Sequence, residues 1–547
     1  MRTTTVEQVA RDIGGQLVGD PRREVGPDVV IDSRKACPGS LFVAFRGQRV
    51  DGHDFADAAA RSGAAAVLAE HVTDADLPHV IVPDPQQGLA RLAASVVSQE
   101  RSRGMIAIDL TGSSGKTSTK DLLAQVLEDE GPTVSPIGSF NNEIGVPLTA
   151  CAVERDTAFL VSEMGARGSG HISRLTNIVP PDVAMVLNVG TAHLGEFGSR
   201  DAIARAKGEI LEALRPDCWA VLNAADPRVA AMTERTGANV AWFGVGEEHR
   251  HTEAEIEVWA TDLAADDLDR YTFKIHLRIE GRHSAHRVSL RTMGEHQVSN
   301  AVAAAAAASC ALTRASNRKA DPERIARSLS QATTRSPLRM QIEERSDGLV
   351  LVNDCYNANP DSMAAALRTV GDILTRRADS DPRTRGVAVL VDMLELGEQS
   401  AQRHRDVGEL AVGRGFDEIL CIGQYAEDLA AGAISAGGRA RVVTADEAAD
   451  AAGEAHARRR LGAHIGVDVA PGEGDVHLRE RDPHRGDVLH AHPLLAQALQ
   501  GEDLLGRAGP QGDALALEVL DRVDIGVAAG NHFSPATFRA IAAVQHG

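Results

Sequence analysis

Cysteines, lysines and aromatic side chains are all scarce in this chain of 547 residues. Its six cysteines are scattered and include no Cys-x-x-Cys pair, which argues against a disulfide framework and against a structural zinc site. No apolar run is long enough to span a bilayer, and the amino-terminal residues lack the apolar core of a signal peptide. We therefore expect a cytoplasmic protein that is not embedded in a membrane.

Basic residues are outnumbered by acidic ones, with 57 Lys and Arg against 77 Asp and Glu and a formal net charge of −20. A protein that coats nucleic acid needs basic surface to displace counterions, so we expect no nucleic-acid partner. Only six of the basic residues are lysine, which makes each lysine conspicuous. The apolar fraction of 43% is ordinary for a globular protein and excludes disorder as the main state.

The length predicts three or four domains at about 150 residues each, and the sequence pattern favours three. Residues 1–100 alternate short apolar runs with Gly and Pro, which is typical of a small α/β domain. Strand and helix signals alternate over 101–333 and indicate a largely parallel sheet with covering helices. A third α/β pattern covers 334–455.

Residues 456–547 form an atypical tail that is rich in Arg and His and contains no lysine. We recognise in it no final strand for the third domain. Two explanations stay open for this tail: a genuine divergent extension, or a shifted reading frame. Under the second hypothesis we expect the tail to be poorly ordered or easily proteolysed.

The most informative motif is a glycine-rich loop between an apolar strand and an amphipathic helix. Backbone N–H groups of such a loop, together with the helix N-terminus, bind phosphate groups. Lys116 would neutralise phosphate charge, and Thr117 has a hydroxyl suited to Mg²⁺. The motif therefore predicts a nucleoside triphosphate site formed by Gly112, Ser113, Ser114, Gly115, Lys116, Thr117 and Ser118.

Three further residues follow the apolar runs that come after this loop. Glu163 ends one predicted strand, His193 follows another, and Lys207 lies in a helical Ala-Lys-Gly-Glu segment. In an open α/β sheet, ligand-binding groups gather beyond the carboxyl ends of the strands. The spacing of these residues does not by itself identify a metal site.

Several long segments resemble the Mur ligases of peptidoglycan synthesis: TGSSGKTST (111–119), SFNNEIGVPLT (139–149), SEMGA (162–166), NVGTAHLGEFGS (188–199) and IARAKGEI (203–210). NDCYNANPDSM (353–363) and DMLELGEQS (392–400) are similar to the members that use D-alanyl-D-alanine. The resemblance implies an α/β, three-domain architecture. It would comprise a UDP-sugar-binding N-terminal domain, a central P-loop domain that binds ATP, and a Rossmann-like C-terminal domain.

The resemblance also implies roles for individual residues. Lys116, Lys207 and His193 would be catalytic. Two Mg²⁺ ions would be bound by Thr117, Glu163, His193 and a carbamylated Lys207. Asn300 would lie near the adenine, whereas Arg339 and Asp354 would reach ATP when the C-terminal domain closes. Contacts to the substrate are expected from Ser33, Arg34, Asn141, Asn142 and Asn357.

The activity implied is ATP-dependent amide-bond formation, by a monomer, between UDP-N-acetylmuramoyl-tripeptide and D-alanyl-D-alanine. The tripeptide carboxylate would become an acyl phosphate that the dipeptide amine attacks. Two alternatives stay open: an impaired relative that binds ATP and UDP-sugar without catalysis, or another amino-acid ligase of the superfamily. The atypical tail favours impairment, while the intact set of Lys116, Glu163, His193 and Lys207 opposes it.

Overall fold

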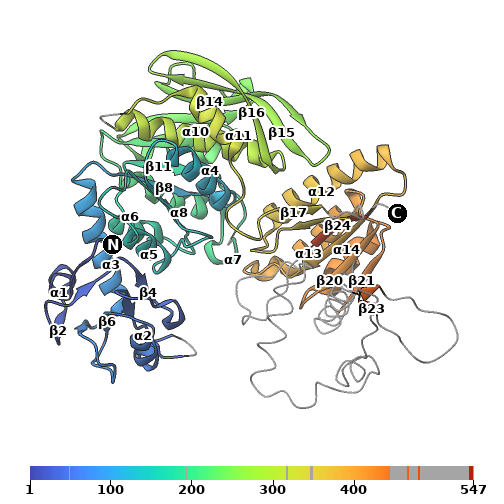
Figure 1. The fold of residues 1–547 in the computed structure, drawn as a ribbon. Coiled ribbons are helices and arrows are strands. Elements are labelled where there is room, and N and C mark those ends of the chain that lie inside the picture. The colour runs from blue at the N-terminus through green and yellow to red at the C-terminus, as the bar shows by residue number, and fades with distance from the viewer. Residues whose placement is uncertain are drawn as a thin grey trace. The chain divides into compact units, whose positions relative to one another are not determined.

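The computed structural model describes residues 1–47, 50–192, 194–315, 318–344 and 349–443, and the backbone of three strands at 465–466, 479–480 and 541–545 (Figure 1). The chain forms two compact units. The first comprises Met1–Arg339, Asn359–Ile373 and Glu395–Glu398, and the second Met340–Ala358, Leu374–Leu394 and Gln399–Gly547. The domain boundaries expected near residues 100, 333 and 455 stay predictions.

The amino-terminal part of the first unit contains a five-stranded sheet in the order β2-β7-β6-β5-β4. Its strands are β2 (Gln16–Val18), β4 (Val29–Val30), β5 (Leu41–Val43), β6 (Ala66–Ala69) and β7 (His79–Ile81). They are parallel except for β2. The associated helices are α1 (Val6–Ile13), α2 (Ala56–Arg61) and α3 (Pro85–Arg101). Helix α3 begins where Asp84 accepts a hydrogen bond from the Gln87 amide and Pro85 occupies the first turn.

A nine-stranded sheet follows in the order β16-β15-β14-β13-β12-β11-β8-β10-β9. The strands β8 to β14 run parallel, as the alternating pattern predicts. Their bounds are β8 (Ile106–Thr111), β9 (Thr133–Val134), β10 (Phe159–Glu163), β11 (Val183–Val186), β12 (Trp219–Asn223), β13 (Asn239–Val245) and β14 (Ile256–Ala265). An antiparallel extension, β15 (Arg270–Ile279) and β16 (Arg282–Met293), was not predicted.

Helices pack on this sheet and separate two apolar cores. Side chains of β8 alternate between them: Ile106, Ile108 and Leu110 enter one core, and Ala107 enters the other. Along α10 (His296–Arg314), residues 301–308 are alanines apart from Val302, and all eight are wholly buried. Their small side chains allow close packing against α4 (Lys116–Glu128) and β13. The other helices include α5 (Gly145–Cys151), α6 (His171–Ile178), α7 (Leu194–Phe197), α8 (Arg200–Glu212), α9 (Pro227–Ala230) and α11 (Pro322–Gln331).

The second unit is built on a six-stranded sheet in the order β17-β18-β24-β19-β20-β21. Its strands are β17 (Gln341–Glu344), β18 (Val350–Asn353), β19 (Arg385–Val391), β20 (Glu418–Ile422), β21 (Ala440–Val442) and β24 (Ile541–Gln545). Helices α13 (Ser400–Gly413) and α14 (Ala426–Ser435) belong to this unit, and α12 (Pro360–Ser380) is shared by both. No helix among the described residues is long and apolar enough to cross a membrane.

One strand of this sheet comes from the atypical tail. The backbone of β24 pairs antiparallel with both β18 and β19. This strand was not predicted, because the tail lacks the sequence motif that usually marks the final strand in the family. The strands β22 (Ile465–Gly466) and β23 (Arg479–Glu480) also pair with each other. The rest of the tail, and with it the expectation of disorder, lies outside the described residues.

Candidate active site

The predicted phosphate loop joins the carboxyl end of β8 to the first turn of α4. Gly115 has a φ of +78°, a conformation that favours glycine, and a Cβ there would lie 2.5 Å from Asn300 Oδ1. The Lys116 ammonium donates to the Gly112 carbonyl at 2.7 Å and so stays folded over the loop. The strand, loop and helix are thus confirmed as the sequence predicts them.

Asn188, which follows β11, holds the loop in shape. Its Oδ1 accepts hydrogen bonds from the backbone N–H groups of Ser113 and Ser114, both at 3.0 Å. Its amide nitrogen donates to the Ser114 carbonyl at 3.2 Å. These two loop N–H groups are donors of the kind that bind phosphate oxygen, and here a neutral amide oxygen accepts from them.

A buried carboxylate lies beside the start of α4. Glu163 is 1% exposed, and its Oε2 accepts from Thr117 Oγ1 at 2.9 Å. Its Oε1 accepts from Ser139 Oγ and from Asn141 Nδ2, each at 2.8 Å. Among the residues that the structure describes, no Lys or Arg forms an ion pair with Glu163, so neutral donors alone satisfy a buried anion. A hard divalent cation is the partner that such oxygen atoms favour.

Two basic side chains, Lys116 and Arg339, lie near this carboxylate, and a third basic residue, Lys207, lies near Lys116. Arg339 Nη2 donates to Thr117 Oγ1 at 3.3 Å. Burial lowers the pKa of Lys116, Glu163 opposes that change, and Arg339 lowers the pKa further. Lys207, in α8, is 4% exposed, and burial together with Lys116 lowers its pKa well below the ordinary value. The charge suits a polyanion such as a triphosphate.

Comparison with known proteins places these features in a family. The chain matches the family "Mur ligase family, catalytic domain" over residues 28–103, "Mur ligase middle domain" over 110–308, and "Mur ligase, glutamate ligase domain" over 338–464. It is 39% identical over 542 residues to the UDP-N-acetylmuramoyl-tripeptide–D-alanyl-D-alanine ligase of Mycobacterium tuberculosis, covering 92% of this chain and 99% of that one. The chain belongs to the Mur ligase family.

Solved structures of Mur ligases have the same fold. A crystal structure of MurF from Acinetobacter baumannii superposes with a TM-score of 0.68 at 30% identity, covering 84% of this chain and 94% of that one. MurF from Thermotoga maritima in complex with ADP gives a TM-score of 0.59 at 29% identity, covering 79% and 91%. The α/β architecture of N-terminal, middle and C-terminal Mur ligase domains is therefore confirmed.

Four other residues that the sequence predicted for the site lie at or near the phosphate loop and Glu163. Asn300 is buried beside Gly115, and its amide donates to Gln297 Oε1 at 3.0 Å. Ser118 lies in the first turn of α4. Asn142 lies just before α5, and its Oδ1 accepts from the Gly145 amide at 2.8 Å. Its neighbour Asn141 instead contacts Glu163, so the two asparagines have separate structural roles.

The expected UDP-sugar residues lie far along the chain from the phosphate loop. Ser33 and Arg34 belong to a single helical turn that Asp32 caps. Arg34 is 87% exposed and pairs with Asp32 at 2.8 Å. The exposed guanidinium is held by a local carboxylate.

The remaining expected residues are found outside this cluster. Asp354 and Asn357 belong to the second unit, where Asp354 Oδ1 accepts from the Met340 amide at 3.2 Å. Asn357 Oδ1 accepts from the Ala358 amide at 3.0 Å. His193 lies outside the described residues. Among the residues that are described, no group of three or more His, Cys, Asp or Glu gathers in a way that could hold a metal.

A second buried lysine of this Mur ligase, besides Lys207, was not singled out from the sequence. Lys120 is 0% exposed and pairs with Asp121 at 2.6 Å. Its ammonium also donates to the carbonyls of Pro136 and Gly138 and to Ser336 Oγ at 3.4 Å. These contacts hold the segment that leads to Ser139, whose hydroxyl donates a hydrogen bond to Glu163. The scarcity of lysine was the available signal for it.

Proposed function

We propose that this Mur ligase joins D-alanyl-D-alanine to UDP-N-acetylmuramoyl-tripeptide, using ATP and giving UDP-N-acetylmuramoyl-pentapeptide, ADP and phosphate. The name of the Mycobacterium tuberculosis relative, and its alignment over nearly the whole chain, support this activity. The observation that carries it is the meeting of the phosphate loop with a buried carboxylate, through Thr117 and Glu163. The alternatives, an impaired relative or another amino-acid ligase, are not favoured.

The reaction has two steps. A carboxylate oxygen of the tripeptide attacks the γ-phosphorus of ATP, and ADP leaves as the acyl phosphate forms. The dipeptide amine then attacks the acyl carbon, loses a proton, and expels phosphate as the amide bond forms. Lys116 and the loop N–H groups place positive charge where the phosphates gain negative charge, which stabilises the transition state.

We further propose that Mg²⁺ binds at Glu163 and Thr117. The residues fit such a cation, because a buried carboxylate with only neutral donors lies beside the hydroxyl of the phosphate loop. When bound, the ion neutralises phosphate charge. His193 is kept as a further ligand of a second Mg²⁺ on the family resemblance. Asn300, Arg339 and Asp354 are kept on the same basis as residues that contact the nucleotide.

Lys207 is proposed to act as a carbamate. Its amine has no hydrogen-bond or ion-pair partner among the residues that the structure describes, and its lowered pKa favours the neutral form. A neutral amine attacks carbon dioxide, and loss of a proton leaves an anionic carbamate oxygen. That oxygen is a hard ligand, whereas a bare ammonium would repel a metal ion. The carbamate would also place an anion near Lys116, which disfavours protonation of the Lys207 amine.

The other substrate contacts stay proposals drawn from the resemblance. Ser33 and Arg34 are assigned to the uridine diphosphate, and Asn141, Asn142 and Asn357 to the tripeptide or the dipeptide. Exposure leaves the Arg34 side chain free to exchange Asp32 for a phosphate group. We also propose that the enzyme is a monomer and works in the cytoplasm.

The activity is tested by phosphate release from the full-length chain. ATP, Mg²⁺, UDP-N-acetylmuramoyl-tripeptide and D-alanyl-D-alanine are each omitted in turn, and the product is identified by mass spectrometry. We expect release to require all four and the pentapeptide to form. Tight ATP binding without release would indicate an impaired relative instead. Release that depends on a single amino acid in place of the dipeptide would indicate another ligase.

A further inference from the structure

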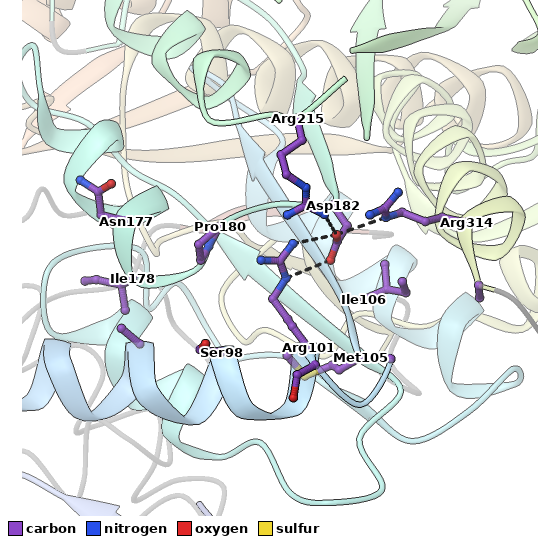
Figure 2. Close-up of a pocket in the computed structure, with 14 residues that line it drawn as sticks. Ser98, Arg101, Met105, Ile106, Asn177, Ile178, Pro180, Asp182, Arg215 and Arg314 are labelled. Carbon is purple, nitrogen blue, oxygen red and sulfur yellow. Dashed lines mark hydrogen bonds and ion pairs between the residues drawn. The ribbon is translucent and has the colours of Figure 1, made fainter. Parts of the chain in front are cut away.

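A cavity of about 710 Å³ lies at the opposite end of β8 from the phosphate loop. Its lining includes Met105 and Ile106, where β8 begins, and Asp182, which immediately precedes β11 (Figure 2). Because β8 and β11 are parallel, both contribute their amino ends here and their carboxyl ends to the active site. The cavity is therefore separate from the site described above. Its volume lies within the range of small-molecule sites.

Three arginines point toward one carboxylate in this cavity (Figure 2). Arg101 contacts both oxygens of Asp182, with Nη2–Oδ1 at 2.7 Å and Nε–Oδ2 at 3.2 Å. Arg314 Nε lies 3.2 Å from Asp182 Oδ1. Arg215 Nη2 lies 3.4 Å from the same oxygen. The Ala107 amide donates to Oδ2 as well, so the two oxygens of Asp182 already accept five hydrogen bonds and cannot neutralise a further donor.

The positive charge of this cluster is only partly neutralised. A second carboxylate, Asp217, pairs with Arg314 at 2.9 Å and with Arg215 at 3.3 Å, but it is 61% exposed. Three guanidinium groups thus face two carboxylates. Within the described part of the chain, Nη1 of Arg101 and Nη1 of Arg215 donate no hydrogen bond. A guanidinium with an unused N–H edge binds carboxylate or phosphate oxygens well.

The rest of the wall is mixed: Ser98, Ser102 and Asn177 are polar, and part of the surface is apolar. Met105, Ile106, Ile178 and Pro180 line the cavity beside the arginines (Figure 2). An inorganic ion would leave this surface uncovered, whereas an organic anion would cover it. We propose that this cavity binds a small molecule that carries a carboxylate or phosphate group on a compact apolar body. Arg215 and Arg101 hold the anionic group, and the apolar wall holds the body.

Arg215 is the residue on which to test the site. Its side chain is 52% exposed and its ion pairs are long, so its replacement leaves the fold intact. Arg324 offers a matched control, because it is 48% exposed, pairs with Glu130 at 3.2 Å and lies outside the cavity. We compare Arg215→Gln with Arg324→Gln, and we check both by thermal unfolding.

The probes are phenyl phosphate and benzoate, with phenol as the uncharged control, titrated calorimetrically. Excess ADP and Mg²⁺ are present so that the phosphate loop is occupied. We expect saturable binding of at least one anionic probe and none of phenol. In Arg215→Gln the affinity should fall at least about tenfold, the loss of one charged hydrogen bond, while Arg324→Gln behaves as wild type. Equal affinity in Arg215→Gln, or no binding of either anionic probe to wild type, overturns the proposal.

Discussion

Asp109 lies in the middle of β8, three residues before the phosphate loop begins. It is wholly buried, and Ser162 of β10 and Ala184 of β11 are its neighbours across the sheet. Neither carboxylate oxygen has a hydrogen-bond partner in the described structure. Burial raises the pKa of Asp109 well above its ordinary value. Arg101 and the neighbouring Ser162 side chain oppose that rise only in part, and Asp182 adds to it. We predict that Asp109→Val stabilises the protein.

The size of the gain depends on pH. A buried polar group without a partner costs about 1–3 kcal/mol, and valine removes that cost. In the unfolded chain the Asp109 carboxyl has the ordinary pKa of 3.8, so it loses its proton above about pH 4, whereas the folded protein keeps that proton. Because the folded state then binds more protons, its stability falls as pH rises, by about 1.4 kcal/mol per pH unit. The advantage of the variant grows with pH until Asp109 ionises in the folded state.

Urea unfolding of wild type and Asp109→Val between about pH 5 and pH 8 measures this difference. Asp109→Asn is the matched control, because it removes the titrating group but keeps a buried polar side chain. Asp109→Asn should lose the part of the pH dependence of stability that Asp109 causes, but it should gain less stability than Asp109→Val. A difference between wild type and Asp109→Val that stays constant with pH, or a valine variant less stable than wild type, would refute the reasoning.

Three further predictions concern the active site. Lys207→Ala should abolish phosphate release, while its affinity for ADP, measured by titration, stays largely intact. When isotopically labelled bicarbonate is supplied, wild type should give a carbamate resonance by NMR and Lys207→Ala should not. Turnover like that of wild type would remove the carbamate assignment. Glu163→Gln keeps a side chain of the same size but removes the charge, so ADP affinity should lose most of its dependence on Mg²⁺; an undiminished dependence would place the ion elsewhere. Lys120→Met leaves Asp121 buried without its partner and should lower the free energy of unfolding by about 3–5 kcal/mol in urea, whereas the exposed Lys319→Met should not. Equal effects of the two lysine substitutions would contradict the buried ion pair.

Local features of the chain were sufficient to predict the phosphate loop and its flanking elements. The apolar run that becomes β8, the glycines of the loop and the apolar face of α4 follow one another directly along the chain. Hydrogen bonding and side-chain periodicity at that range depend on neighbouring residues, so the pattern can be read directly. The long family motifs likewise carried the family assignment. The antiparallel strands β15 and β16 form a local hairpin through a two-residue turn at Glu280 and Gly281, and this turn signal in the sequence was not used.

The tertiary structure alone decided which of these residues meet. Glu163 contacts Thr117 because β10 lies beside β8 in the sheet, an order that no spacing along the chain specifies. Burial, which lowers the pKa of Lys207, depends on how α8 packs. The arginine cluster around Asp182 joins residues from widely separated segments for the same reason. The sequence by itself determined which chemical groups the protein possesses, and the sheet order and burial determined which of them act together.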